Sequence, residues 1–250
     1  MVDVRGRWAL ITGASRGIGY QAALFMARQG CNLILHSRDL EHSARVEREA
    51  RELGVEAYAV QAELGKPQEV EAMLDEIERR GTPVDIILNN AAVQVAYRTD
   101  YWATPIGDFE QSFRINFISI AMICGRLVPK MIERGFGRVV NTTSGIRNEP
   151  EQSAYAASKA ALDKYTKDLA SRLDGTDVIL SLTDPGWCRT DLGGPNAPDA
   201  PESAIPGVAV GAFVNDRKSG RFFHAQQFTG LSLEEAVVKA ESLEAVPYTI

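Results

Sequence analysis

The sequence predicts an α/β protein: a single doubly wound domain of the Rossmann type, with a mostly parallel sheet of about seven strands and helices on both faces. Short apolar runs alternate along the chain with longer amphipathic stretches. The apolar runs are continuous rather than alternating with polar residues, which is typical of strands buried on both faces of a parallel sheet. The regular strand–helix alternation indicates a doubly wound open sheet.

The elements follow one another without an internal repeat or a long linker, so residues 1–250 are expected to form one domain. Strands are predicted at residues 7–11, 32–35, 55–60, 84–88, 137–141, 178–182 and 220–223. Helices are predicted at residues 17–29, 40–53, 67–80, 106–134 (with a possible early break), 152–173 and from 233 onward. Gly30 and Gly54 end the first two helices, and Pro67 occupies the favoured first position of the third.

The composition excludes several classes of protein. A net charge of −6 disfavours nonspecific binding to nucleic acid or to anionic membranes. The three cysteines and three histidines lack the spacing of a disulfide framework or a metal site. The first residues do not resemble a secretory signal, and the apolar run at residues 115–128 is expected to be too short to span a bilayer. A cytoplasmic protein without a metal is therefore expected.

A glycine-rich turn follows the first strand. The segment Thr12-Gly13-Ala14-Ser15-Arg16-Gly17-Ile18-Gly19 must turn the chain from strand to helix, and glycines let the backbone approach a ligand closely. The helix that follows points its first N–H groups at an anion. A purely structural turn is the competing interpretation. The position after the first strand favours a phosphate-binding loop formed by Gly13, Ser15, Arg16, Gly17, Ile18 and Gly19.

The end of the second strand indicates which dinucleotide is bound. An acidic residue here contacts the ribose 2′-hydroxyl of NAD, whereas arginine accommodates the 2′-phosphate of NADP. This chain has Ser37 and Arg38 at that point, and Arg16 offers a second cation. Asp39 is expected to cap the next helix. NADP(H) is therefore predicted over NAD(H), although Arg38 could instead be a solvated surface charge.

A tyrosine and a lysine four residues apart supply acid–base chemistry. Tyr155 and Lys159 lie on one face of a predicted helix. A phenol with a pKa of about 10 is a poor acid or base at neutral pH, and a nearby ammonium lowers that pKa. Alone, this pair is a common feature of surface helices.

Together with the spacing Gly13, Gly17, Gly19, the pair resembles the short-chain dehydrogenase/reductase family, which has a Thr-Gly-x-x-x-Gly-x-Gly loop and a Tyr-x-x-x-Lys motif. The resemblance covers about residues 5–192. It implies a catalytic tetrad of Asn116, Ser144, Tyr155 and Lys159, although the loop from Ser144 to Tyr155 looks shortened. Further cofactor contacts are implied at Glu63 and Leu64 (where the family commonly has Asp for Glu63), at Asn90, Ala91 and Ala92 (where Ala92 replaces Gly), and at Pro185, Gly186, Trp187 and Thr190.

The resemblance implies an NADP(H)-dependent oxidoreductase acting on CH–OH or C=O groups of a small-molecule substrate. Tyr155 is its general acid or base, and a homodimer or homotetramer is expected. Two alternatives stay open: a non-catalytic NADP-binding sensor or interaction protein, and a non-redox epimerase or dehydratase. The chain departs from the family pattern after about residue 193. There a proline-rich loop at residues 193–207, and the helix it leads into, take the place of a substrate lid, expected at residues 193–215.

Overall fold

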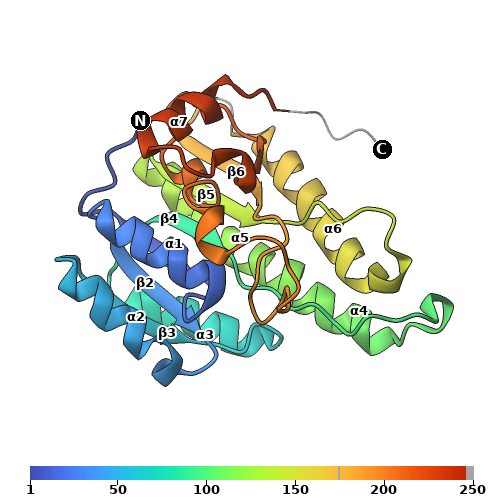
Figure 1. The fold of residues 1–250 in the computed structure, drawn as a ribbon. Coiled ribbons are helices and arrows are strands. Elements are labelled where there is room, and N and C mark those ends of the chain that lie inside the picture. The colour runs from blue at the N-terminus through green and yellow to red at the C-terminus, as the bar shows by residue number, and fades with distance from the viewer. Residues whose placement is uncertain (174, 246–250) are drawn as a thin grey trace.

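The computed structural model describes residues 1–173 and 175–245, which form an α/β fold around a seven-stranded sheet (Figure 1). The strand order is β3-β2-β1-β4-β5-β6-β7, and every neighbouring pair is parallel. The strands are β1 (Trp8–Ile11), β2 (Asn32–Ser37), β3 (Ala57–Gln61), β4 (Val84–Asn89), β5 (Gly137–Thr142), β6 (Val178–Asp184) and β7 (Phe222–His224). The predicted doubly wound fold class is thus confirmed.

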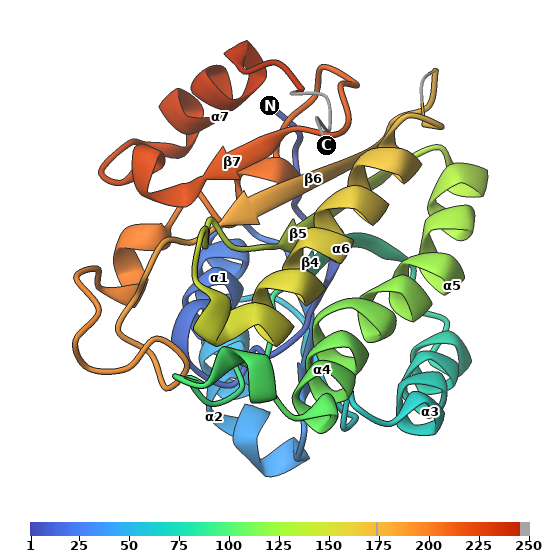
Figure 2. The ribbon, with the colours of Figure 1, turned by 90° about the vertical axis from the view of Figure 1, so that its right-hand side faces the viewer.

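Helices cover both faces of the sheet. They are α1 (Gly17–Arg28), α2 (Leu40–Glu52), α3 (Pro67–Arg79), α4 (Ile106–Phe113), α5 (Ser119–Arg134), α6 (Ser153–Ala170) and α7 (Leu233–Ser242). Helices α1, α2 and α7 share one hydrophobic core, while α3, α5 and α6 share the other. Figure 2 shows α6 crossing the sheet beside α4 and α5.

The strand sequences explain why two cores form. Side chains of a strand alternate between faces, so a continuously apolar strand supplies both layers. In β1, Ala9 and Ile11 enter the core under α1, and Leu10 enters the core under α5. β2 and β4 repeat this division, with Ile34 and Ile87 on the α5 side.

The long predicted helix at residues 106–134 is interrupted. A π-helical turn at Arg114–Ile118 separates α4 from α5, as the possible early break anticipated. By length and composition alone, the whole stretch Ile106–Arg134 could span a membrane. The sequence expectation considered only the shorter run at residues 115–128, so a length argument does not exclude a span by the full stretch. In this fold α5 packs Ile120, Ile123 and Leu127 into the core against the sheet.

Two other segments differ from expectation. The last strand begins at Phe222 instead of residue 220, because Gly220 has a φ of +85°, outside the extended region. The segment expected as a lid continues into the core: Ala204, Val208 and Phe213 are buried. Only short 3₁₀ turns occur there, at Pro201–Ala204 and Val210–Ala212. The expected tail from residue 233 forms α7, and residues 246–250 lie outside the described part.

Candidate functional site

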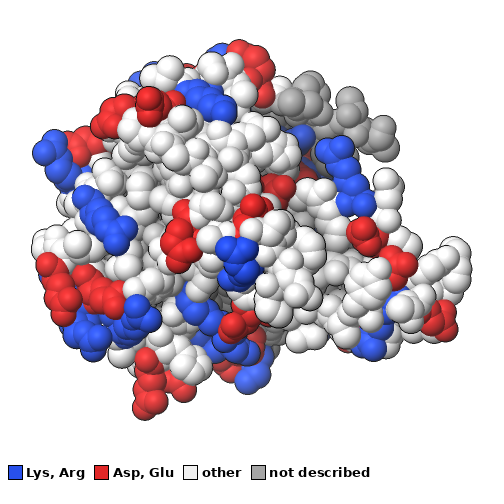
Figure 3. All heavy atoms as spheres, in the orientation of Figure 1, with Lys and Arg blue, Asp and Glu red and all other residues white. Residues whose placement is uncertain are grey.

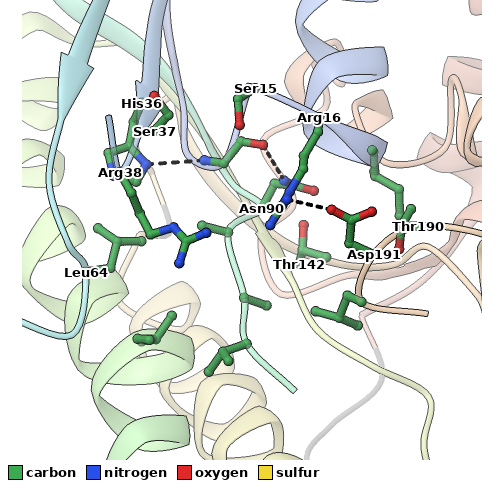
Figure 4. A pocket seen from close by; sticks show the side chains of 18 of the residues that line it. Ser15, Arg16, His36, Ser37, Arg38, Leu64, Asn90, Thr142, Thr190 and Asp191 are labelled. Carbon is green, nitrogen blue, oxygen red and sulfur yellow. Dashed lines mark hydrogen bonds and ion pairs between the residues drawn. The ribbon is translucent and has the colours of Figure 1, made fainter. Parts of the chain in front are cut away.

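A cavity of about 1080 Å³ opens at the carboxyl ends of the strands (Figure 4). Parallel α/β sheets bind ligands at this edge. Most of the predicted cofactor residues line it: Gly13, Ser15, Arg16, Gly17, Ile18, Ser37, Arg38, Glu63, Leu64, Asn90, Ala91, Ala92, Tyr155, Lys159, Pro185 and Thr190. The predicted residues that do not line it are Gly19, Asn116, Ser144, Gly186 and Trp187.

The glycine loop packs so tightly that no side chain fits at Gly19. A Cβ on Gly19 would lie 2.1 Å from the Gly13 carbonyl oxygen, and Gly13 itself has a φ of +66°. The loop is tied to the end of β4, because Thr12 Oγ1 accepts from the backbone N–H groups of Asn90 and Ala91, each at 3.0 Å. Asn90 Nδ2 in turn donates to the Thr12 carbonyl at 3.2 Å. Asn90 therefore shapes the loop with its side chain.

His36 is a buried residue of the site that the sequence did not reveal. Its Nδ1 accepts from Gly13 N–H at 3.2 Å, and its Nε2 lies 3.0 Å from the Ala62 carbonyl. Nε2 must donate to that carbonyl, so the imidazole is neutral, and burial lowers the pKa of His36. His36 thus links the glycine loop to β2 and β3. A histidine next to Ser37 in an otherwise apolar strand was the available signal.

The two arginines predicted to bind a 2′-phosphate both line the cavity but differ in their partners. Arg38 extends over the cavity from the end of β2 and has no ion pair among the residues that the structure describes (Figure 4). Arg16 also lines the cavity, but it forms an ion pair with Asp191 at 2.5 Å (Figure 4). Arg114, from the π turn, supplies another cation to the lining. Ser37 Oγ donates to the Asp39 carbonyl, and Asp39 caps α2 as expected.

The acidic residue after β3 has an internal partner. Glu63 Oε1 accepts from Gly65 N–H at 3.3 Å, and the Glu63 backbone N–H donates to Glu69 Oε2 at 2.7 Å. Leu64 is buried beside it, so this turn forms an apolar wall with one carboxylate. This composition is compatible with an adenine ring.

Tyr155 and Lys159 meet at the cavity, on the first turns of α6. Both are buried, and Lys159 Nζ lies 5.8 Å from the Tyr155 ring centroid. Lys159 Nζ donates to the Thr142 carbonyl at 2.8 Å. Burial lowers the pKa of Lys159 to about 8, and the carboxylates of Asp163 and Asp184 oppose that fall.

The pKa of Tyr155 differs from the sequence expectation. It is raised, because burial of the phenol outweighs the hydrogen bond with Ser144, and the Asp184 carboxylate raises it further. The ammonium of Lys159 was expected to lower it. In this site Tyr155 is therefore a protonated group at neutral pH.

Ser144 and Asn116, the other two residues of the expected tetrad, lie in different parts of the fold. Ser144 follows β5; its Oγ accepts from the Ile146 N–H at 3.3 Å, and its hydroxyl lies near enough to Tyr155 to lower the pKa of the phenol. Asn116 is fully buried in the π turn. Its side chain bonds to the backbone of Val93 and donates to Ser158 Oγ at 3.0 Å, and Ser158 Oγ donates to the Tyr155 carbonyl. Asn116 thus joins the loop after β4 to the helix that carries Tyr155.

The segment after β6 closes one side of the cavity. Thr190 lies against the glycine loop, since a Cβ on Gly17 would be 3.2 Å from Thr190 Cγ2. Trp187 is 59% exposed, and its Nε1 donates to the Gly193 carbonyl at 2.7 Å. A core role for Trp187 is thereby excluded. Gln21 of α1 donates to Glu202 at 2.8 Å, so the segment has contacts to the helix that follows the glycine loop.

Comparisons with known proteins agree with this architecture. The short chain dehydrogenase family model matches residues 7–200, so the chain belongs to the short-chain dehydrogenase/reductase family. A short-chain type dehydrogenase/reductase from Picea abies is 32% identical over 75% of this chain and 72% of its own length. A 3-oxoacyl-(acyl-carrier-protein) reductase from Staphylococcus epidermidis is 28% identical over 83% of this chain and 86% of its own.

Other relatives are longer than the matched region. This chain spans 66% of the mouse retinol dehydrogenase 13, to which it is 29% identical over 84% of its residues. Among solved structures, a 3-oxoacyl-(acyl-carrier-protein) reductase from Agrobacterium tumefaciens with NADP bound has a TM-score of 0.73 and 28% identity. That match covers 92% of this chain and 87% of the neighbour. The chain thus belongs to a family of dehydrogenases and reductases, and its fold matches solved structures of that family.

Proposed function

We propose that this protein reduces a carbonyl or oxidises an alcohol with NADP(H), and that Tyr155 transfers the proton. The observation that carries the proposal is the position of Tyr155 and Lys159, buried together at the cavity on one face of α6. A non-catalytic sensor on the same fold would need neither group.

The lining of the cavity supports a dinucleotide as its occupant. The close approach of Gly13 and Gly19 leaves backbone N–H groups at the start of α1 for a pyrophosphate. Glu63, Leu64, Ala91 and Ala92 surround the place of the adenosine, while Pro185 and Thr190 border the nicotinamide end. Arg38 supports NADP over NAD, because its guanidinium extends over the cavity beside the end of β2 and matches a phosphate.

When bound, the nicotinamide supplies or accepts the hydride. In reduction, Tyr155 donates its phenolic proton to the oxygen of the substrate as negative charge develops there. Ser144 holds the same oxygen with its hydroxyl. Lys159 stabilises the resulting phenolate and holds the nicotinamide ribose. The raised pKa of Tyr155 keeps the phenol protonated at neutral pH, which favours its use as an acid.

The test is the Tyr155→Phe variant, assayed for NADPH oxidation against a panel of carbonyl compounds. We expect turnover to fall by about 10²- to 10⁴-fold, the usual contribution of a general acid, with NADPH affinity largely retained. Tyr165→Phe on the same helix is the matched control and should keep full activity. Unchanged turnover in Tyr155→Phe would remove the mechanism. NADPH binding without turnover on any substrate would favour the sensor.

We further propose a cytoplasmic homo-oligomer formed through the long helices. The support is the pair of exposed side chains Ile118 and Ile132, which are 39% and 43% accessible at the two ends of α5.

Acidic and basic side chains are interspersed on the face seen in Figure 3, which offers no continuous basic surface for nucleic acid. The partly exposed loop at residues 193–203, the outer part of the segment expected as a lid at residues 193–215, is the proposed substrate lid. Sedimentation analysis of wild type and Ile118→Glu tests the assembly.

A further inference from the structure

The buried ammonium of Lys159 forms no ion pair among the described residues, but two carboxylates on different elements raise its pKa from nearby. Asp163 follows Lys159 by four residues on α6, so the two side chains project from the same face of the helix. Asp184 ends β6, the strand that pairs with β5. The Lys159 ammonium binds the Thr142 carbonyl, and Thr142 pairs with Thr183, the residue before Asp184. One carboxylate thus approaches from the helix and the other from the sheet.

Asp184 is also close to the reacting groups. A Cβ on Gly145 would lie 2.6 Å from Asp184 Oδ2, so the carboxylate packs against the backbone immediately after Ser144. The Asp184 side chain is only 15% exposed. Its Oδ1 accepts from Gly186 N–H at 3.0 Å, which fixes the carboxylate in place. The negative charge of Asp184 is therefore held at a fixed position near Tyr155 and Lys159.

Asp163 is half-buried with its carboxylate incompletely satisfied. The Thr143 hydroxyl lies beside it, yet neither Asp163 Oδ1 nor Thr143 Oγ1 has a hydrogen-bond partner among the described residues. Burial raises the pKa of Asp163, whereas Thr143 and the ammonium groups of Lys167 and Lys159 lower it. A charged carboxylate is retained at such a place most readily when a cation lies next to it.

We propose that Asp163 and Asp184 are positioning residues that keep Lys159 cationic and Tyr155 protonated, which is the state needed for carbonyl reduction. The charged and titratable groups around Lys159 are Tyr155 and Asp163 on α6 and Asp184 on β6. Lys167 lies one turn beyond Asp163, and His224 of β7 lies 3.6 Å from Asp184. Burial lowers the pKa of Lys159 and both carboxylates raise it. Asp184 additionally raises the pKa of Tyr155.

The experiment measures NADPH affinity against pH by fluorescence in Tyr155→Phe, where no phenol titrates and turnover is suppressed. The inference rests on the proposed role of Lys159 in holding the nicotinamide ribose. Affinity should fall as pH rises through about 8, where Lys159 loses its proton, and this step should be absent after Lys159→Ala. Adding Asp163→Asn or Asp184→Asn should move the step to lower pH by about one pH unit, the effect of removing one nearby charge.

The controls separate charge from structure. Asp163→Glu keeps the charge and should keep the step near its original pH. Asp168→Asn removes an exposed carboxylate on the same helix, one that pairs with Lys164, and should leave the step unmoved. Asp184→Asn preserves an acceptor for Gly186 N–H, so it carries the test if Asp163→Asn fails to fold.

A step that stays at the same pH in both asparagine variants overturns the inference and leaves the proposed function intact. If the step is absent before the carboxylates are changed, Lys159 does not hold the cofactor in its charged form, and the inference falls with that part of the mechanism. Retained turnover in Tyr155→Phe overturns the proposed function itself. Turnover is measured separately from the pH at which NADPH affinity falls, so the two failures can be told apart.

Discussion

Asn116 and Val93 are joined by two hydrogen bonds of opposite direction. Asn116 Nδ2 donates to the Val93 carbonyl at 2.9 Å, and Asn116 Oδ1 accepts from the Val93 N–H at 2.8 Å. The pair satisfies both backbone groups of Val93, which lies in the loop after β4. Because Val93 borders the cavity, this side chain fixes one wall of the site from the π turn.

Asn116→Ala should therefore lower stability as well as activity. Both backbone groups of Val93 lose their partner, and a buried unsatisfied polar group costs about 1–3 kcal/mol. Urea denaturation should show a loss of this size in the free energy of unfolding. Asn215→Ala, at an exposed position, is the control and should lie close to wild type. Equal stability of the two variants would show that the Val93 pair is dispensable.

Gly19→Ala should abolish NADPH binding. The new Cβ would lie 2.1 Å from the Gly13 carbonyl oxygen, so the loop must move before it can hold a pyrophosphate. Gly125→Ala is the matched control, because Gly125 is also in a helix and a Cβ there meets no described atom within 4 Å. That variant should gain up to about 1 kcal/mol of stability from helix propensity. Isothermal titration with NADPH distinguishes them, and tight binding by Gly19→Ala would contradict the proposed loop function.

Arg38→Asp should reverse the preference between the two dinucleotides. Loss of a charged hydrogen bond to the 2′-phosphate should lower kcat/KM for NADPH by roughly 10- to 100-fold. The new carboxylate can accept from the 2′-hydroxyl of NADH, so kcat/KM for NADH should not fall. Arg28→Asp, an equal change of charge at the exposed end of α1, should alter neither value. An unchanged NADPH/NADH ratio in Arg38→Asp would leave Arg38 as a surface charge.

Lys159→Met should stabilise the fold at neutral pH while removing activity. The pKa of Lys159 falls from 10.5 to about 8 on folding, which corresponds to a cost of about 3 kcal/mol for keeping the amine charged. Below pH 8 the folded wild type bears this cost in full. Between pH 8 and 10.5 the unfolded state binds more protons, so the stability of wild type rises with pH. The advantage of Lys159→Met should shrink over that interval in denaturation measured at several pH values, and a constant difference would contradict the buried charge.

Much of the fold could be predicted from sequence because both faces of the sheet are buried. Continuous apolar runs such as β2 and β4 leave a parallel sheet as the natural arrangement, and their predicted positions agree to within a few residues. The π turn at Arg114–Ile118 was expected only as a possible break, because π hydrogen bonding has no periodicity that a sequence reveals. The strand at Phe222 was displaced by the conformation of Gly220, which depends on its surroundings.

The candidate site could be predicted where a motif fixes the local geometry. Gly13, Gly17, Tyr155 and Lys159 line the cavity, whereas Gly19 of the same motif does not. The direction of a long side chain has no such local determinant. Arg16 therefore pairs with Asp191, a residue that only the tertiary structure brings near it. His36 acts through contacts with Gly13 and Ala62, which lie on two different strand ends.

The buried guanidinium of Arg138 has a practical consequence for the boundaries of the protein. Arg138 Nε donates to the Val214 carbonyl, and its other nitrogens bind Gly137 and Asp177, so β5 depends on a residue beyond the family match. Phe213, Phe223 and Phe228 lie in the same core. A fragment trimmed to residues 7–200 would therefore expose aromatic surface and leave the buried Arg138 Nε without its Val214 acceptor. A shortened version of this enzyme should therefore retain the chain through α7, even though the family match ends at residue 200.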